Sequence, residues 1–424
     1  MKKKIAFISE HASPLATLGG VDSGGQNVYV AELAKQLSKS GYEIDIFTRQ
    51  DDYKLPPVVN WEAGIRVIHV KAGPAFNIPK EELLQYMPHF TENMLSFMQK
   101  ENISYKLIHA NFWMSGLVAC ELKAILGIPF VITFHALEHV RKLYQKEADK
   151  FPLSRIAIEE EIVKCADRII AECPQDMEDL IRYYHAPSKK ISVIPCGFSK
   201  KEFYPVNRMQ ARIILNLDLH ENIILQLGRM VPRKGVDNVI RALAKLNDTA
   251  SPARLVIVGG DSDEPDAALC PEIARLWQIA KEENILSSIT FTGRKNRDML
   301  KYYYSAADIF VTTPWYEPFG ITPLEAMACG TPVIGSDVGG IKYSVAEGCT
   351  GFLVPPNDPQ ALAEKLELLL SDQQLLSAMK TNAINRVNKE FTWTHVSKMV
   401  AKLYQSIDKT LQKTDLVTNE EKAA

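Results

Sequence analysis

The stretch IPCGFSKKEFYPVNR, residues 194–208, separates two series of alternating strand and helix patterns. In the first series the strand candidates are KIAFIS (4–9), EIDIFT (43–48), IRVIHV (65–70), KLIHA (106–110), FVITFHA (130–136), RIIAE (168–172) and ISVIP (191–195). In the second they are IILQLG (223–228), ARLVIVG (253–259), SITFTG (288–293), DIFVTT (308–313), TPVIGS (331–336) and GFLVP (351–355). Amphipathic helical patterns lie between them. Such alternation indicates parallel sheets with helices on both faces. We therefore expect two doubly wound, Rossmann-like α/β domains in tandem.

The boundary is expected near 197–210, where glycine, proline and charged residues cluster. We assign 1–205 to an N-terminal domain and 206–389 to a C-terminal domain. A helical pattern over 373–410 is long enough to return to the first domain, so 390–410 is expected to belong there. Residues 411–424 are expected to form a flexible tail.

Asp358 followed by Pro359 is typical of a helix start, with a capping carboxylate before a first-turn proline. It opens the apolar-periodic stretch 360–371. This part of the second series is therefore expected to be helical.

The composition is that of an ordinary soluble globular protein, with 424 residues, 46% hydrophobic and 24% charged. A net charge of −2 argues against recruitment of nucleic acid by a global basic field. No apolar stretch is long enough to span a membrane, and the N-terminus lacks a signal-peptide pattern. The seven cysteines have no metal-ligand spacing, which favours a reducing cytoplasm. The sequence leaves open whether the protein associates peripherally with a membrane and whether it forms a homodimer.

In open α/β sheets, ligands bind beyond the carboxyl ends of the strands, so residues that follow strands are the candidates for a site. The loop and helix start in LGGVDSGGQNVYVAELAKQL (18–37) bring backbone N–H groups close to an anion. Gly24 and Gly25 are the candidate phosphate-facing residues; a plain loop is the alternative. The pattern is not G-x-G-x-x-G, so a dinucleotide dehydrogenase is disfavoured.

Two cations follow the first strand of the second series, in LQLGRMVPRKGVD (225–237). Arg229 offers a forked guanidinium and Lys234 a point charge, a combination that suits a diphosphate. The alternative is a pair of solvated surface cations.

The stretch EPFGITPLEAMACGTP (317–332) carries two glutamates, Glu317 and Glu325. A carboxylate pair is also the usual apparatus of glycoside hydrolysis, so a hydrolase is one interpretation. Glu317 falls on a loop after a strand, and Glu325 near the start of a helix that Pro323 opens. Between them, the backbone N–H groups around Phe319, Gly320 and Ile321 are expected to meet an anion.

His135 and His11 each follow a predicted strand and are candidate site residues, although a lone histidine is more often structural. The acidic run GGDSDEPD (259–266) contains a spacing that other sugar transferases use for a divalent metal. No histidine or further ligand cluster accompanies it, so we expect a solvated loop and no essential metal or other cofactor.

Together the motifs GGVDSGGQNVYVAELA, GRMVPRKGVD, VGGD, EPFGITPLEAMACGTPVIGSDVGG and GFLVPPND resemble the large retaining glycosyltransferase family of the GT-B fold. That family includes sucrose-phosphate synthase and the inositol-phosphate N-acetylglucosaminyltransferase of the mycothiol pathway, and the likeness is greatest to the latter. It spans roughly residues 5–405 and implies two domains facing across a cleft.

The resemblance implies a nucleotide-sugar donor, with UDP favoured, and no essential metal. It places Arg229 and Lys234 on the diphosphate with help from Gly24 and Gly25, Glu325 on the ribose and Arg294 near the base. Glu317 and His135 are implied to contact the sugar at the reacting centre. The implied acceptor contacts are His11, Asn27, Lys80 and Arg155.

Two positions depart from the inositol-phosphate subgroup. Phe112 stands where the subgroup has tyrosine, and Ala136 where it has threonine, and in the family both residues reach the acceptor phosphate. The acceptor therefore stays open among inositol phosphate, a sugar phosphate, a lipid and a glycan. A GDP-mannose-dependent mannosyltransferase, a nucleotide-sugar epimerase of the same fold and a non-enzymatic nucleotide-sugar-binding regulator are the alternatives.

Overall fold

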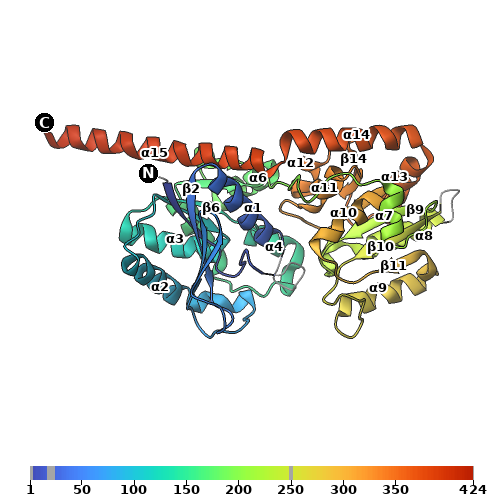
Figure 1. Cartoon of the computed structure of the whole chain (residues 1–424), viewed down its shortest axis with the longest axis horizontal. Coiled ribbons are helices and arrows are strands. Elements are labelled where there is room, and N and C mark those ends of the chain that lie inside the picture. The colour runs from blue at the N-terminus through green and yellow to red at the C-terminus, as the bar shows by residue number, and fades with distance from the viewer. Residues whose placement is uncertain (1–2, 17–23, 248–251, 424) are drawn as a thin grey trace. The chain divides into compact units, whose positions relative to one another are not determined.

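The strand and helix alternation predicted from the sequence is present in both halves of the chain (Figure 1). The structure, a computed structural model, describes residues 3–16, 24–247 and 252–423. Unit 1 comprises the described residues of 1–16, 24–195 and 393–424, and unit 2 comprises 196–392. The prediction of two α/β domains built on parallel sheets is confirmed.

Unit 1 is built on an eight-stranded sheet of order β3-β4-β2-β1-β5-β6-β7-β8, in which only β3 is antiparallel to its neighbour. The strands are β1 (Lys3–Ile8), β2 (Tyr42–Arg49), β3 (Val58–Glu62), β4 (Ile65–Val70), β5 (Leu107–Asn111), β6 (Phe130–Thr133), β7 (Arg168–Ala171) and β8 (Ile191–Val193). The central strands are buried on both faces, which explains their continuous apolar runs. Strand order reverses between β1 and β5.

Helices cover both faces of this sheet (Figure 1). They are α1 (Gly25–Lys39), α2 (Met87–Lys100), α3 (Trp113–Leu126), α4 (Glu138–Gln145), α5 (Arg155–Cys165), α6 (Pro174–Tyr184) and α15 (Trp393–Ala423), with 3-10 turns at Lys80–Tyr86, Lys146–Ala148 and Ser188–Lys190. The C-terminal α15 packs on α1, where Trp393 meets the ring of Tyr29 edge-on.

Unit 2 is built on a parallel six-stranded sheet of order β11-β10-β9-β12-β13-β14. Its strands are β9 (Asn222–Leu227), β10 (Ala253–Val258), β11 (Ile289–Phe291), β12 (Ile309–Thr312), β13 (Val333–Ser336) and β14 (Gly351–Val354). Its helices are α7 (Arg208–Ile214), α8 (Val236–Asn247), α9 (Pro271–Glu282), α10 (Arg297–Ala306), α11 (Thr322–Ala328), α12 (Gly339–Ser344), α13 (Pro359–Ser371) and α14 (Gln373–Glu390), with 3-10 turns at Pro232–Lys234 and Leu286–Ser288. Here the strand order reverses between β9 and β12.

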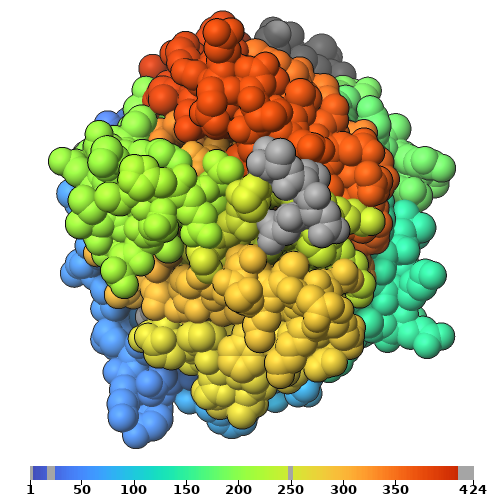
Figure 2. All heavy atoms as spheres, turned by 90° about the vertical axis from the view of Figure 1, so that its right-hand side faces the viewer, coloured from blue at the N-terminus to red at the C-terminus, as the bar shows by residue number. Residues whose placement is uncertain are grey.

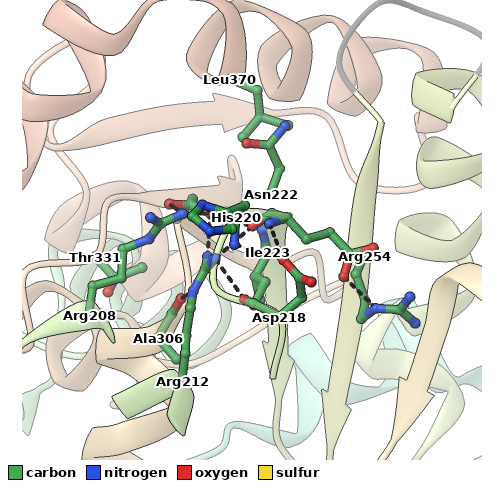
Figure 3. A network of polar contacts seen from close by, with 12 residues as sticks. Arg208, Arg212, Asp218, His220, Asn222, Ile223, Arg254, Ala306, Thr331 and Leu370 are labelled. Carbon is green, nitrogen blue, oxygen red and sulfur yellow. Dashed lines mark hydrogen bonds and ion pairs between the residues drawn. The ribbon is translucent and has the colours of Figure 1, made fainter. Parts of the chain in front are cut away.

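A buried arginine ties α7 to the amino-end edge of the unit 2 sheet (Figure 3). Arg212 is fully buried; it donates to the main-chain oxygens of Ala306, Asp218 and Glu221 and to Asp308 Oδ2 at 2.9 Å. Asp308 Oδ2 also accepts from the Ile223 amide at 2.9 Å. The network fastens the starts of β9 and β12, which leaves their carboxyl ends to carry loops.

The observed boundary differs from the predicted one at 205/206, because unit 2 begins at Cys196. The Phe198 amide donates to Phe391 O at 2.9 Å, and Phe203 lies against the ring of Tyr304, so these residues pack with unit 2. The same pairing explains a second difference. The helix predicted over 373–410 is interrupted, because Phe391 and Thr392 form an extended bridge with Phe198.

Residues 411–423, expected to form a flexible tail, continue the helix α15 in the structure. The stretch KTDLVTNEEKAA contains no glycine or proline to end a helix. The Asp358 prediction is confirmed, since this carboxylate accepts from the Ala361 amide at 2.9 Å and caps α13. Within the described ranges, no helix is long and apolar enough to cross a bilayer.

Candidate active site

Two groups of polar side chains stand beyond the carboxyl ends of the strands, one in each unit, and each group is at the point where strand order reverses. Such switch points are where open α/β sheets bind ligands. The unit 2 group is described first because its charge is the more distinctive.

In unit 2, Lys234 and Glu317 meet across the β9–β12 reversal. The Lys234 ammonium donates to Glu317 Oε2 and both side chains are largely buried, 18% and 12% exposed. Arg233 Nη1 lies 3.7 Å from the same carboxylate oxygen, and its guanidinium stacks on Tyr316. Arg229, directly after β9, is close enough to act electrostatically on both Lys234 and Glu317.

The backbone fixes this arrangement through glycines. Gly235 follows Lys234 with a φ of +65°, and a Cβ there would stand 2.0 Å from the main-chain oxygen of Thr313 at the end of β12. Thr313 Oγ1 in turn donates to Gly235 O at 3.0 Å. Gly339 has a φ of +46°, and a Cβ there would stand 1.9 Å from Glu317 O. Both close approaches require glycine; the first holds the Lys234 loop against the end of β12, and the second holds the start of α12 against the Glu317 loop.

The pKa shifts of Lys234 and Glu317 follow from burial and from the charges around each group. Burial lowers the pKa of Lys234 to about 8; Glu317 opposes this effect, and Arg233 and Arg229 add to it. Burial acts to raise the pKa of Glu317, but Lys234, Arg233 and Arg229 outweigh burial, so the net shift is downward. Three cations thus share one carboxylate, and the group has positive charge to offer an anion.

Other predicted donor residues lie near this group but make internal contacts. Glu325 is 3% exposed, accepts from the Tyr304 hydroxyl at 2.9 Å and pairs with Arg297 at 3.1 Å. Its predicted role on a ribose is therefore at odds with this arrangement, in which both oxygens have partners. Arg297 was not among the residues predicted from the sequence. Its position three residues after Arg294 is the feature of the sequence that could have pointed to it.

Phe319 is buried with its ring near Phe391, so its side chain does not face solvent, whereas Gly320 and Ile321 are half-buried. Arg294 follows β11, two strands from β9, and lies 3.3 Å from Asp263 Oδ1. Asp263 belongs to the acidic loop 259–266, whose spacing resembles that of a metal-binding motif, so a carboxylate of this loop is paired with an arginine. Among the described residues no cluster of His, Cys, Asp or Glu could hold a metal ion.

A separate cavity of about 560 Å³ in unit 2 is lined by Tyr204, Pro205, Val206, Asn207, Gln210, Ile213, Ile214 and Tyr302. Figure 2 shows the surface of unit 2 with α7 in light green. None of these described lining residues is charged, and Arg229, Lys234 and Glu317 are not among them. We therefore assign the ligand site to the charged group rather than to this cavity.

In unit 1, His11 follows β1 and meets residues that follow β5. His11 Nδ1 lies 2.8 Å from Glu10 Oε1, and its ring packs edge-on against Phe112. Glu10 is fully buried, accepts from the Ser115 hydroxyl and donates its amide to Ser115 Oγ at 3.2 Å. Glu10 and Ser115 were not among the predicted residues; Glu10 directly follows a predicted strand, which is the signal that marked His11.

His135 follows β6 and is held at both ring nitrogens. Nδ1 lies 3.0 Å from Glu172 Oε1 and Nε2 lies 3.2 Å from Asn111 Oδ1. The Asn111 amide nitrogen faces the main-chain oxygens of Ile8 and His109, which leaves Oδ1 as an acceptor for His135. His135 also has a φ of +59°, uncommon for a residue with a side chain. A fixed, strained histidine at a strand end fits a site role.

The predicted acceptor contacts divide in the structure. Asn27 is buried; its Oδ1 accepts from the Gly24 amide at 2.9 Å, and its Nδ2 donates to Ser13 O at 2.9 Å. It therefore fastens the start of α1, and the Gly24 amide is engaged there. Gly25 is the first residue of α1, and residues 18–23 of the glycine-rich stretch lie outside the described residues. Lys80 lies 3.6 Å from Glu81 after β4, two strands from β1.

Arg155 was predicted to contact an acceptor, but its side chain is fully buried in unit 1. Its guanidinium donates to Glu159 Oε1 at 2.8 Å and to Ala136 O at 2.7 Å, and lies 3.1 Å from Glu138. Phe112, Trp113 and Phe151 surround it.

Comparisons with known proteins agree with the fold. Residues 207–386 match the family model Glycosyl transferases group 1, and residues 23–201 match Glycosyltransferase Family 4. The D-inositol 3-phosphate glycosyltransferase of Corynebacterium glutamicum (strain R) is 36% identical over 408 residues, 95% of this chain and 96% of that protein. That of Thermobispora bispora is 34% identical over 407 residues, 95% of this chain and 94% of that protein.

Among solved structures, sucrose-phosphate synthase from Thermosynechococcus elongatus has a TM-score of 0.88 and 35% identity, covering 96% of this chain and 100% of that one. Anabaena HepE, solved with UDP and glucose, has a TM-score of 0.73 at 19% identity, covering 95% of this chain and 100% of that one; this likeness concerns the fold alone. The resemblance predicted from the motifs is confirmed: the chain belongs to the group 1 glycosyltransferases of the GT-B fold.

Proposed function

We propose that the enzyme transfers a hexosyl unit from a nucleoside-diphosphate sugar, UDP-linked, to an acceptor hydroxyl with retention of anomeric configuration and without a metal ion. The observation that carries the proposal is the group of Arg229, Arg233 and Lys234 around Glu317 at the β9–β12 reversal. A departing nucleoside diphosphate gains negative charge on its phosphate oxygens. Cations already fixed where that charge develops lower the barrier without reorganisation.

Glu317 has two tasks in this proposal. In the free protein it partners Lys234; with donor bound, the diphosphate takes over the cations and the carboxylate turns to the sugar hydroxyls. The excess of cations over carboxylates makes this exchange electrostatically favourable. Arg294 and the main chain at Phe319, Gly320 and Ile321 complete the donor contacts we propose. Glu325, paired with Arg297, reaches the ribose only if that pair opens.

His135 is the proposed group beside the reacting sugar. Glu172 and Asn111 fix its ring, so no ordering cost arises when substrate arrives. The acceptor hydroxyl attacks on the face from which the diphosphate leaves, and the leaving phosphate oxygen takes the acceptor proton. Positioning and charge stabilisation thus replace an enzymic nucleophile.

The relatives named for inositol 3-phosphate and sucrose phosphate suggest a phosphorylated polyol or sugar as acceptor. His11 and Lys80 are the proposed acceptor contacts that remain accessible in part. Because Arg155 is committed to Glu138 and Glu159, Lys80 is the cation proposed to meet an acceptor phosphate. The free cysteines support placement of the enzyme in a reducing cytoplasm.

The test is a panel of UDP- and GDP-sugars scored by thermal shift, because the true donor stabilises the protein by mass action. The stabilising donor is then incubated with inositol phosphate, hexose phosphates and their unphosphorylated counterparts, and the product is examined by proton NMR. Acceptor-dependent UDP release with the donor's anomeric configuration is expected. An inverted product would overturn the retaining assignment, and conversion of the donor sugar without an acceptor would favour an epimerase.

A further inference from the structure

Unit 1 contains a basic cavity away from the carboxyl ends of its strands. The cavity measures about 360 Å³ and lies where α3 and α5 end and β7 begins. Its lining includes five cations and one carboxylate: Lys123, Lys164, Arg168, Lys189, Lys190 and Asp167. His135 and Glu172 follow the carboxyl ends of β6 and β7, so this cavity is at the opposite edge of the sheet from them.

The positive charge of this cavity exceeds its negative charge. Asp167 Oδ2 already accepts from Lys123 Nζ at 2.7 Å and from the Phe130 amide at 2.9 Å. Lys190 donates to the main-chain oxygens of Val163 and Lys164, and burial lowers its pKa, with the charge of Lys123 adding to the effect. An anionic reagent would therefore be attracted to the cavity.

Two thiols meet at the wall of this cavity. Cys165 is the last residue of α5 and lines the cavity, while Cys120 stands in α3 one turn before Lys123. Lys123 Nζ donates to Cys165 O at 2.9 Å, which joins the two helices at this level. Burial raises the pKa of the Cys120 thiol, and the adjacent Cys165 thiol raises it further by charge and by a hydrogen bond.

Accessibility separates this pair from the other cysteines. Cys120 and Cys165 are free and partly exposed. Of the remaining five, Cys349 is exposed and belongs to unit 2, whereas the other four are buried: Cys173, Cys196, Cys270 and Cys329. An accessible thiol beside a second thiol and several cations is the arrangement in which oxidation is site-selective.

We propose that Cys120 and Cys165 form a reversible dithiol site for disulfide reagents that carry carboxylates. The Cys165 thiolate attacks one sulfur of the reagent, forms a mixed disulfide and releases one thiolate. Cys120 then loses its proton to solvent and attacks the Cys165 sulfur, displacing the second thiolate. The two protein thiols are oxidised, the reagent is reduced to two thiols, and excess thiol reverses the reaction.

The product would join α3 and α5 near their carboxyl ends. The other ends of the two helices lie near the candidate site: α3 follows Phe112, which packs against His11, and α5 starts at Arg155, whose guanidinium lies over the Phe112 ring. The Cys120–Cys165 disulfide would therefore join, beside the basic cavity, two helices whose other ends lie at the opposite edge of the unit 1 sheet.

The experiment treats the reduced full-length chain with oxidised glutathione at low salt and maps tryptic peptides without reduction. A linked species of peptides 107–123 and 165–168 is expected, and dithiothreitol should separate it. Cystamine, which carries ammonium groups instead of carboxylates, should form the link about tenfold more slowly, and 1 M salt should remove most of the difference.

Two variants make the result decisive. Cys120→Ser should stop at glutathione attached to Cys165, and Lys189→Gln, at an exposed cation of the cavity, should slow the reaction with oxidised glutathione several-fold. Cys349→Ser removes the exposed thiol of unit 2 and should leave the link unchanged. Glutathione attached without a 120–165 link in the unmodified chain, or equal rates with the two reagents, would overturn the proposal.

Discussion

The two switch points of this enzyme share a topology and differ in charge. At the unit 1 switch point, polar side chains pair with one another: His11 with Glu10, and His135 with Glu172. At the unit 2 switch point, three cations surround a single carboxylate, Glu317. The same strand reversal thus supports one edge that orients side chains and another that attracts an anion. Fold alone does not indicate which unit binds which substrate, and the difference in charge is the basis for the proposed placement of the donor in unit 2.

The arginines of this protein also differ in how deeply their side chains are buried. Arg155 and Arg212 are fully buried and hold helices to their sheets, whereas Arg229 is only half-buried beside the cation group. The side chains of Arg155 and Arg212 are paired with carboxylates and main-chain oxygens inside their own units and are not exposed to a ligand. A candidate contact in a sequence motif therefore needs exposure as well as charge.

The largest expected effect concerns Arg155→Met in unit 1. Removal of this guanidinium leaves Glu138 and Glu159 buried without their cation, which should cost about 3–5 kcal/mol of unfolding free energy. Arg275 is the matched control, because it also pairs with two carboxylates, Glu272 and Asp237, but is 40% exposed. Arg275→Met should cost about 1 kcal/mol or less. A loss for Arg155→Met as small as that expected for Arg275→Met, measured by urea denaturation, would show that Arg155 is not structural.

The next effect is on turnover, through Glu317→Gln in unit 2. The variant removes the carboxylate that competes with the diphosphate for Lys234, so UDP should bind as tightly as before or tighter. Sugar transfer should nevertheless fall about 100-fold, because contacts to the reacting sugar are lost. Glu283→Gln, at a surface pair with Arg241, is the control. A glycosyl group found covalently on Glu317 by mass spectrometry would contradict the electrostatic role.

A smaller effect is the pH dependence of UDP binding. Burial lowers the pKa of Lys234 to about 8, so its charge in the free protein is present below that pH and is lost as pH rises. UDP affinity should fall above pH 8 by at most about tenfold per pH unit. Lys234→Arg keeps its charge and should flatten the profile. An equally steep profile in that variant would remove Lys234 as the titrating group.

The smallest expected effect is that of metal removal. In the proposed mechanism the cation group supplies the charge that a divalent metal would bring to a diphosphate, so EDTA should leave the transfer rate unchanged. Complete loss of activity with EDTA, restored by Mg²⁺, would mean that the cations are insufficient.

Much of this architecture follows from local sequence. The apolar β-branched runs mark thirteen of the fourteen strands found in the described part of the chain, and the residues after them include Arg229, Lys234, Glu317 and His135. The missed strand, β3, is short, follows Pro56 and Pro57, and pairs antiparallel at the sheet edge. The predicted helix 373–410 had no local signal for its interruption, because the break depends on a bridge between Thr392 and the distant Phe198.

The site was less accessible to sequence reasoning for the same reason. Glu325 and Arg155 have the residue types and spacing of ligand contacts, but their partners, Tyr304 and Glu138, become neighbours only in the folded chain. Whether a charge is committed internally depends on such tertiary pairs, which spacing along the chain does not reveal.

The most direct test of the central claim, that the cation group of unit 2 binds the donor diphosphate, is calorimetric titration of UDP into Arg229→Ala. Loss of a charged hydrogen-bond donor should weaken UDP binding about 10- to 100-fold. Arg241→Ala, which removes an exposed arginine paired with Glu283 in the same unit, should bind UDP like the unaltered chain. Unchanged UDP affinity in Arg229→Ala would contradict the claim.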